Sequence, residues 1–325
     1  MVIGVTGASG HIGNNLCRAL IAEGYLVRAQ INNSNESLKE VPVKTITGDV
    51  TKKVDTDLLV EGCDLVIHLA AKISIHGDKD GEVRRVNVEG TRNIVNSCIQ
   101  FGVKRFIHFS SIHTMNPFPL DEELNENRPY VPNGTDYDNS KIEAEKIVLK
   151  AMQSGLKANI VCPTSVFGIN DFYPSLLGQA IIDLYKGKIP ALPPGGYDFV
   201  NVQDIVAGTL AIIRSDINGE KYLMSGSFKT VQELAGEVSK QGQVKTTQLV
   251  LPSWFLKSLV PFFILGSKLS KKDPIFTYES LRALIESNTK ISSAKAKRDL
   301  DYKVTPFDES IRETLNWFKK NGQID

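Results

Sequence analysis

A tyrosine and a lysine four positions apart, Tyr137 and Lys141, are the pair in this sequence best suited to move a proton. Residues four apart share one face of a helix, so a phenol and an ammonium group point in the same direction. A free tyrosine has a pKa of about 10 and exchanges protons poorly at neutral pH. A nearby cation favours the phenolate and lowers that pKa, as general acid–base catalysis requires. The pair therefore predicts proton transfer to or from a substrate.

Two serines, Ser110 and Ser111, follow a continuous apolar run at residues 105–109. Such a run is typical of a parallel strand covered on both faces, and ligands bind at the carboxyl edge of such sheets. A serine hydroxyl there hydrogen-bonds a substrate oxygen and holds it against the tyrosine. We expect one of these serines to complete the catalytic group.

Glycines at positions 7, 10 and 13 lie between an expected strand at 2–6 and an expected helix at 11–23. They permit a tight turn, a close approach of the backbone to a pyrophosphate, and close packing of helix on strand. The free N–H groups and positive dipole end of the helix favour phosphate. The residues expected to hold a dinucleotide here are Gly7, Ser9, Gly10, His11, Ile12 and Gly13.

Short apolar runs alternate with segments of helical periodicity in the first half of the chain. The expected strands are 2–6, 25–31, 43–47, 64–69, 105–109 and 158–162, and the main expected helices are 11–23, 81–101 and 137–152. This alternation predicts an α/β fold with a Rossmann-type, doubly wound parallel sheet.

Proline and glycine become frequent after Pro163, and the spacing of elements loosens. A strand-helix unit at 199–214 and a strand at 220–224 are expected to return to the main sheet. The rest is expected to be mostly helical and to end in a helix at 307–320. The predicted dinucleotide-binding domain is 1–162 plus about 199–224. The predicted substrate-binding lobe is about 163–198 plus 225–325.

The glycine spacing, the Tyr137–Lys141 pair and several further segments resemble the extended short-chain dehydrogenases/reductases of the NAD-dependent epimerase/dehydratase superfamily. The further segments are Gly48-Asp49-Val50, His68-Leu69-Ala70-Ala71, Asn87-Val88-Glu89-Gly90-Thr91 and Cys162-Pro163-Thr164-Ser165-Val166-Phe167-Gly168. The resemblance covers most of the chain and looks strongest to the branch of dihydroflavonol reductases and 3β-hydroxysteroid dehydrogenases. It implies hydride exchange with NAD or NADP, and a homodimer packed through helices.

The resemblance also assigns roles to single residues. Ser111 is the better match for the catalytic serine and Ser110 the second choice, Tyr137 is the acid or base, and Lys141 binds the nicotinamide ribose and lowers the pKa of Tyr137. Contacts to the dinucleotide are implied for Asp49, Val50, Leu69, Ala70, Ala71, Pro163 and Thr164, the last two through the main chain. His68 and Asn87 are expected to be structural, and Asp49 has a turn-forming aspartate as its alternative.

The second expected strand ends in Asn32-Asn33-Ser34. NAD-preferring relatives usually place a carboxylate there, and NADP-preferring relatives an arginine. This sequence has neither. Because no carboxylate repels a 2′-phosphate, and Asn32 and Asn33 are able to donate to one, we expect NADP ahead of NAD. Arg28 lies earlier in the strand.

Two departures from relatives bear on the substrate. Dehydratases resembling this family carry an acidic pair after the serine, where this chain has Ile112-His113-Thr114, and epimerases often carry an arginine at the position of Tyr197. Both departures favour an uncharged, moderately hydrophobic ketone, aldehyde or alcohol. The side chains expected near this substrate are His113, Met115, Phe118, Phe172 and Tyr173.

Three functions follow from these patterns. The leading hypothesis is a carbonyl reductase or alcohol dehydrogenase. The first alternative is a nucleotide-sugar 4-epimerase with tightly bound NAD. The second is a non-catalytic dinucleotide-sensing protein, although such proteins typically lose the tyrosine or the lysine, and both are present here.

Composition narrows the classes further. With a net charge of +1, nothing favours nucleic acid or an anionic membrane over a small-molecule ligand. The four cysteines form no CxxC pair and are expected to be reduced core thiols, and no metal site is expected. The N-terminus lacks the features of a signal peptide, so we expect a cytoplasmic protein. The most apolar stretch, 254–265, is too short to cross a bilayer and is expected to be a lid or core helix, with a peripheral membrane contact as alternative.

Overall fold

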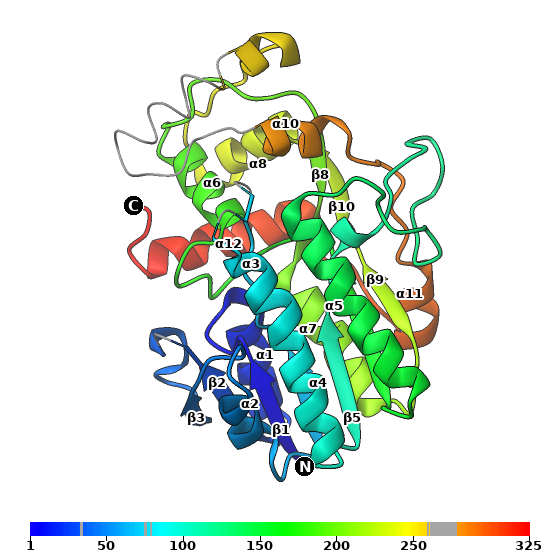
Figure 1. Ribbon diagram of the computed structural model, residues 1–325. Coiled ribbons are helices and arrows are strands. Elements are labelled where there is room, and N and C mark those ends of the chain that lie inside the picture. The colour runs from blue at the N-terminus through cyan, green and yellow to red at the C-terminus, as the bar shows by residue number, and fades with distance from the viewer. Residues whose placement is uncertain (33–34, 75–76, 79, 259, 261–277) are drawn as a thin grey trace.

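A parallel sheet forms the centre of the computed structural model, which describes residues 1–325 except 33–34, 75–76, 79, 259 and 261–277 (Figure 1). Its strands are β1 (Val2–Thr6), β2 (Leu26–Ile31), β3 (Lys44–Thr47), β4 (Leu65–His68), β5 (Arg105–Phe109), β6 (Ala158–Pro163) and β9 (Lys221–Met224). They lie in the order β3-β2-β1-β4-β5-β6-β9, and every neighbouring pair is parallel. The order reverses between β1 and β4, which is where ligands bind in doubly wound sheets. The predicted fold class is confirmed.

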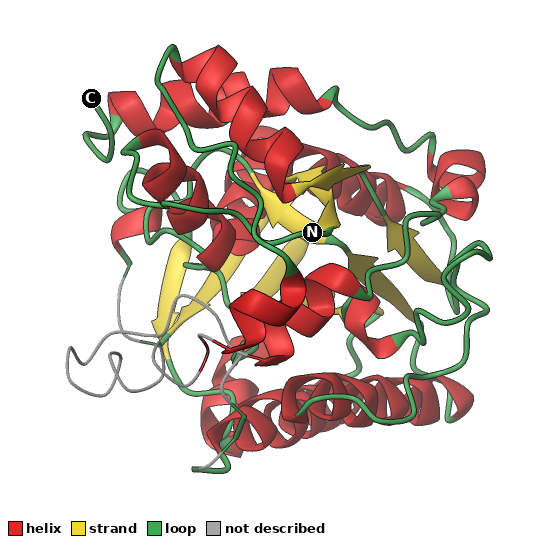
Figure 2. Cartoon of the chain, turned by 90° about the horizontal axis from the view of Figure 1, so that it is seen from above, coloured by secondary structure: helices red, strands yellow, loops and turns green. Residues whose placement is uncertain are grey.

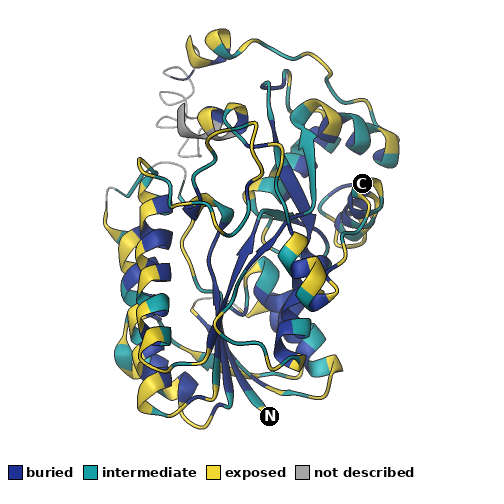
Figure 3. Ribbon diagram, turned by 90° about the vertical axis from the view of Figure 1, so that its right-hand side faces the viewer, coloured by how far each residue is buried: buried dark blue, intermediate teal, exposed yellow. Residues whose placement is uncertain are grey.

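Helices cover both faces of this sheet. One face carries α1 (His11–Ala22), α7 (Val202–Arg214) and α11 (Ala294–Leu300), and the other carries α2 (Lys53–Val60), α4 (Gly90–Gln100) and α5 (Asp136–Gln153). Neighbouring strand residues belong to opposite cores, since Ile67 packs in the first and Val66 in the second. The strands are therefore buried between helices whose outer faces are exposed, as Figure 3 shows.

A smaller sheet and further helices form the second lobe, which Figure 2 views from above. The sheet contains β7 (Ser165–Phe167), β8 (Gly196–Asn201) and β10 (Ser227–Thr230), with β8 in the middle, parallel to β7 and antiparallel to β10. The helices are α6 (Leu176–Tyr185), α8 (Val231–Gly242), α10 (Tyr278–Ile285) and α12 (Phe307–Lys320). Phe167, Phe199 and Phe318 are central to the core of this lobe.

The expected return to the main sheet is only partly correct. The strand at 221–224 joins it beside β6, and α7 packs against α1 as part of the first lobe. The strand before α7, however, pairs with β7 and β10. Strand patterning shows which face is apolar but does not name the partner strand, so the short strand at 165–167 could not be foreseen as its neighbour.

The expected helix at 81–101 is present but interrupted. It begins as α3 (Glu82–Arg84), passes through a π-helical segment, η2 (Arg85–Glu89), and continues as α4. Such segments occur frequently at functional sites. Here the segment contains Asn87, which binds both the loop after β4 and helix α5.

All four cysteines are buried and free, which confirms the expectation of reduced core thiols. No helix among the described residues is long and apolar enough to cross a membrane. Half of the apolar stretch 254–265 lies outside the described residues, namely residue 259 and residues 261–265.

Candidate active site

Helix α5 presents Tyr137 in its first turn. Thr135 caps the helix, because its side chain accepts from the N–H of Asp138 (3.2 Å) while the Asp138 carboxylate accepts from the N–H of Thr135 (2.8 Å). This capping box satisfies two backbone donors and fixes where the helix begins. The phenol consequently lies near the positive end of the helix dipole, which favours a negative charge.

Lys141 lies one turn further along α5 and is buried. Its ammonium donates to the backbone carbonyl of Phe109 at the end of β5 (2.7 Å). Burial lowers the pKa of Lys141 to about 8. The helix and the carboxyl edge of the sheet are thereby joined at the predicted site.

Ser111 connects the end of β5 to Tyr137. Its hydroxyl accepts from the N–H of His113 (3.2 Å) at the start of the 3₁₀ turn Ile112–Thr114. Burial raises the pKa of Tyr137 to about 12, and a hydrogen bond to the Ser111 hydroxyl opposes that rise. The expected lowering of this pKa by Lys141 is therefore not seen: Lys141 is directed to Phe109, and burial of the phenol outweighs the stabilisation of its anion.

The contacts of Glu145 distinguish the roles of Ser110 and Ser111. This buried carboxylate accepts from the hydroxyls of Ser110 (2.7 Å) and Tyr130 (2.9 Å) and from the ammonium of Lys221 (2.7 Å). Ser110 is therefore held in a structural network, which leaves Ser111 to face Tyr137. Sequence reasoning missed Glu145, although it follows Lys141 by four residues and so shares its helix face.

The glycine turn has the shape that a pyrophosphate requires. Gly7 has a φ of +64°, and a Cβ there would lie 2.7 Å from the backbone nitrogen of Ala70. A Cβ on Gly13 would lie 2.2 Å from the carbonyl oxygen of Gly7, so only glycine lets α1 approach this closely. Gly10 begins α1 without a side-chain cap, which leaves the first N–H groups of the helix to an anion. These residues fit a bound dinucleotide phosphate.

The loop after β4 links this turn to α5. The N–H groups of Leu69 and Ala70 both donate to Thr6 (3.1 Å each). Asn87 accepts from the N–H of Lys72 (2.7 Å) and donates to Ser140 on α5 (2.9 Å). The Tyr137–Lys141 pair and the glycine turn are thus tied to one short loop.

Two residues expected to be structural have structural contacts. His68 is buried between the hydroxyls of Thr6 (2.7 Å) and Thr91 (3.0 Å), and burial lowers its pKa to about 3. Asn87 forms the links just described. Asp49 accepts from the N–H of Thr51 (2.9 Å), which is the turn contact of the alternative interpretation, and the carbonyl of Val50 accepts from Asn93 (3.0 Å).

The residues around the end of β2 bear on the choice between NAD and NADP. Asn32 is exposed, whereas Asn33 and Ser34 lie outside the described residues. Arg28 donates to the carbonyl of Leu59 (2.8 Å) at the end of α2 and so points away from the end of β2. Arg18 of α1, which sequence reasoning missed, donates to the carbonyl of Ser37 (2.9 Å), and the Ser37 hydroxyl donates to the carbonyl of Ser9 (2.8 Å).

Four of the expected substrate residues have different surroundings. The ring of His113 lies beside that of Tyr137, with centroids 6.0 Å apart, whereas Met115 is buried in the core under α5. Phe172 packs edge-on against Trp317 (5.2 Å) and lies beneath the Arg18 guanidinium. Met115 is therefore a packing residue, which corrects the expectation for it, whereas Phe172 is half-buried and its expected contact with substrate stays a prediction. Tyr173 is 56% exposed.

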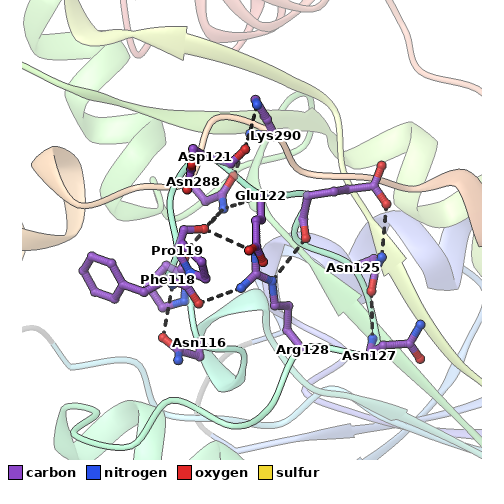
Figure 4. A network of polar contacts seen from close by, with 12 residues as sticks. Asn116, Phe118, Pro119, Asp121, Glu122, Asn125, Asn127, Arg128, Asn288 and Lys290 are labelled. Carbon is purple, nitrogen blue, oxygen red and sulfur yellow. Dashed lines mark hydrogen bonds and ion pairs between the residues drawn. The ribbon is translucent and has the colours of Figure 1, made fainter.

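Phe118 belongs to a loop that the C-terminal part of the chain fixes in place (Figure 4). Asn288 donates to the carbonyls of Pro117 (3.1 Å) and Glu122 (2.9 Å), and Arg128 donates to the carbonyl of Phe118 (2.6 Å). The loop after Ser111 is thereby fastened to the segment that follows α10.

A family model described as the NAD dependent epimerase/dehydratase family matches residues 3–224. The chain belongs to this family. The sequence is 32% identical to the sterol demethylase protein B of Methylococcus capsulatus, over 98% of this chain and 99% of that protein. It is 25% identical to a putative dihydroflavonol 4-reductase of Synechocystis sp. (98% and 95% covered), and 30% identical to the 3beta-hydroxysteroid-dehydrogenase/decarboxylase isoform 1 of Arabidopsis thaliana (87% and 68% covered).

The fold agrees with this membership. The crystal structure of gox2253 superposes with a TM-score of 0.85 at 26% identity, covering 100% of this chain and 99% of that one. As a member of this family, the chain is an NAD-dependent oxidoreductase of the extended short-chain type. Its resemblance to the dihydroflavonol reductase and 3β-hydroxysteroid dehydrogenase branch is confirmed.

Proposed function

We propose that this protein exchanges a hydride between a nicotinamide dinucleotide and a secondary alcohol or ketone on an apolar molecule. One observation carries the proposal: the Ser111 hydroxyl lies close enough to the Tyr137 phenol to oppose the rise of its pKa, with Lys141 one turn away on the same helix. A substrate oxygen placed between the serine and the tyrosine receives two hydrogen bonds from groups that are already in position.

Side chains of the protein carry out the proton transfer. When the dinucleotide is bound it supplies or accepts the hydride. In the oxidation direction Tyr137 takes the hydroxyl proton, and in the reduction direction it returns that proton to the alkoxide. Ser111 holds the same oxygen in both directions. Lys141 would bind the nicotinamide ribose of a bound dinucleotide, which is the role that the family resemblance implies for it.

We further propose that NADP is preferred to NAD. The support is the absence of a carboxylate at Asn32 and the guanidinium of Arg18 behind Ser37, next to the glycine turn. A 2′-phosphate bound at the end of β2 would meet no negative charge from Asn32, and the Arg18 guanidinium would attract it.

The substrate we propose is a fused-ring hydroxy or keto compound of the sterol class. The relatives named for sterol demethylation and for 3beta-hydroxysteroid dehydrogenation support this class. The absence of an arginine at Tyr197, which is half-buried beside Phe199, argues against a nucleotide sugar. A 4-epimerase nevertheless remains the second candidate, because the matched family model includes epimerases.

The test is a screen of steroid alcohols and ketones with NADP(H) and with NAD(H), in which sugar nucleotides are the competing substrate class. Turnover is measured by the change in nicotinamide absorbance. Tyr137→Phe is expected to reduce kcat by about 10²- to 10⁴-fold, the usual contribution of a general acid or base, with little change in dinucleotide affinity. Turnover that survives this substitution, or turnover of sugar nucleotides alone, would refute the proposal.

A further inference from the structure

His11 is a titratable side chain at the phosphate end of α1, and the chemistry described so far does not use it. It is the first residue of this helix and follows Gly10, where the free N–H groups of the helix fit a phosphate. Its Nε2 lies 3.0 Å from the backbone carbonyl oxygen of Ile169, in the segment that follows β7. His11 therefore lies between the expected dinucleotide site and the second lobe.

The contact with Ile169 defines the state of the imidazole. A carbonyl oxygen only accepts, so Nε2 carries a hydrogen and donates it. Burial lowers the pKa of His11 below its usual value, although the charge of Asp171 and two backbone carbonyls oppose this change. The ring is therefore mainly neutral at pH 7, and its Nδ1 has no hydrogen.

Few charged groups face His11 from the described residues around it. Asp171 belongs to the segment after β7 and is buried. Helix α7 packs on α1 and presents the neutral Gln203, which donates to Asn15 (2.7 Å). On α1 itself the next charged side chain is Arg18, two turns further along. The negative phosphates of a dinucleotide would therefore add a large charge to surroundings that contain few.

We propose that His11 takes up a proton when the dinucleotide binds, and that the imidazolium then holds residues 168–171 more firmly against α1. One solvent proton moves to Nδ1, and no other bond changes. Negative charge at the end of α1 favours the protonated ring, and a charged ring donates stronger hydrogen bonds to backbone carbonyls. The inference needs a bound dinucleotide, which membership of the family implies, and does not depend on the proposed substrate.

This proton would connect the two ligand sites. Residues 169–171 lead directly to Phe172 and Tyr173, which are expected near the substrate. Phe172 also lies beneath the guanidinium of Arg18, which shares a face of α1 with His11 because the two are seven residues apart. A bound dinucleotide would thus fix the backbone next to the expected substrate residues. His11 is a positioning residue in this scheme, and the coupling is reciprocal.

Isothermal titration calorimetry with NAD⁺ measures the proton directly. Heats of binding are compared at pH 6.5 in two buffers that differ in ionisation enthalpy, neither of them phosphate. At this pH Lys141, with a pKa of about 8, is already protonated. The wild type should take up a clear fraction of one proton per dinucleotide. NADP⁺ serves in the same comparison between variants, because its 2′-phosphate, which titrates near pH 6, contributes equally to each.

His11→Gln is the decisive variant, because the amide keeps a donor for Ile169 and takes up no proton. It should bind NAD⁺ without proton uptake. The bound protein retains the proton to a higher pH than the free protein, so affinity falls as pH rises. Between pH 5.5 and 7.5 the rise in Kd should be about 3- to 10-fold larger in the wild type than in His11→Gln. Amides of residues 169–171 should gain more exchange protection from NAD⁺ in the wild type.

His113→Gln is the matched control, because this second imidazole lies beside Tyr137 and not on α1. It should keep the wild-type proton uptake. Uptake that is absent in the wild type, or equal in the wild type and His11→Gln, overturns the inference. Uptake lost in His113→Gln and kept in His11→Gln does the same. Each of these results leaves the proposed function standing, because turnover is measured separately.

Discussion

At the scale of single residues, the pKa values of Lys141 and Tyr137 are set by burial and not by the pairing of the two side chains. The expectation from the sequence was that Lys141 acts on Tyr137, yet the buried ammonium binds the carbonyl of Phe109. Desolvation disfavours the charged form of both groups, so the pKa of the lysine falls and that of the tyrosine rises. Residue types and spacing predicted which groups meet, but desolvation depends on how the surrounding chain packs.

The buried Lys141 makes stability depend on pH in a defined window. Its pKa is about 8 in the folded chain and 10.5 when unperturbed, so between these values the unfolded chain binds more protons and stability rises with pH. Between pH 7.5 and 10 the free energy of unfolding of the wild type should gain about 2–3 kcal/mol relative to Lys141→Met. Urea unfolding of both proteins at the two pH values measures this difference. Parallel pH profiles would contradict it.

The cofactor proposal predicts a switch at Asn32, which is exposed at the end of β2. In Asn32→Asp the new carboxylate repels a 2′-phosphate and accepts from the ribose hydroxyls, so the ratio of kcat/KM for NADP over NAD should fall by about tenfold, or 1.4 kcal/mol. Asn32→Ala is the matched control and should change the ratio far less. An unaltered ratio in the aspartate variant would place the ribose elsewhere.

The Glu145 network should be costly to break. In Glu145→Ala the ammonium of Lys221 and the hydroxyls of Ser110 and Tyr130 lose their acceptor, and the free energy of unfolding should fall by about 3–5 kcal/mol. Glu143→Ala, which breaks an exposed pair with Arg84, should cost less than about 1 kcal/mol. Chemical denaturation measures both. Equal losses would mean that burial does not distinguish the pairs.

At the scale of elements, one face of α1 fastens the two lobes together. Asn14 and Asn15 donate to the carbonyls of Asn170 and Ile169 (3.0 Å each), and the ring of His11 meets the same Ile169 carbonyl (3.0 Å). These positions recur at helical spacing, so the polar stripe was readable from the sequence. Its partner was not, because the segment at 169–170 is irregular and has no periodicity.

Asn15 contributes to this link between the two lobes, and its substitution tests the link. It is buried, and its side-chain oxygen accepts from Asn170 (2.9 Å) and Gln203 (2.7 Å). Asn15→Leu leaves those two donors unpaired and removes one of the two contacts to the Ile169 carbonyl, which should lower the free energy of unfolding by about 1–3 kcal/mol. Hydrogen exchange should show the loss of protection at residues 169–171 as well as in α1. Loss confined to α1 would disprove the link between lobes.

Sequence reasoning was strongest where an element is local and weakest where a partner is distant. Strands β1 and β5 begin and end at the expected residues, and α12 does so as well. Met115 was expected at the substrate, but its backbone pairs with Tyr130 and its side chain enters the core under α5. Apolar character does not distinguish a pocket wall from a core, and that distinction depends on which distant segments cover the residue.

At the scale of the whole molecule, the C-terminal segment completes the first lobe. Although α11 follows most of the second lobe in the chain, Ala296, Leu300 and Tyr302 belong to the core that also contains α1 and α7. The Tyr302 hydroxyl donates to the carbonyl of Ser225 just after β9 (3.0 Å). The dinucleotide-binding lobe therefore depends on residues that follow the substrate lobe in sequence, and the two should unfold together.

Leu300→Ala tests this dependence. Truncation of this buried side chain should lower the free energy of unfolding by about 2–5 kcal/mol, whereas Leu58→Ala, at a leucine that is 56% exposed on α2, should change it by less than about 0.5 kcal/mol. Because α11 covers the sheet, amides in β1 and β9 should lose exchange protection together with α11. A dinucleotide that binds only the folded chain should restore stability as its concentration rises, since it shifts the equilibrium by mass action. If α11 alone loosened while β1 kept its protection, the C-terminal segment would be an appendage, and the first lobe would be complete without it.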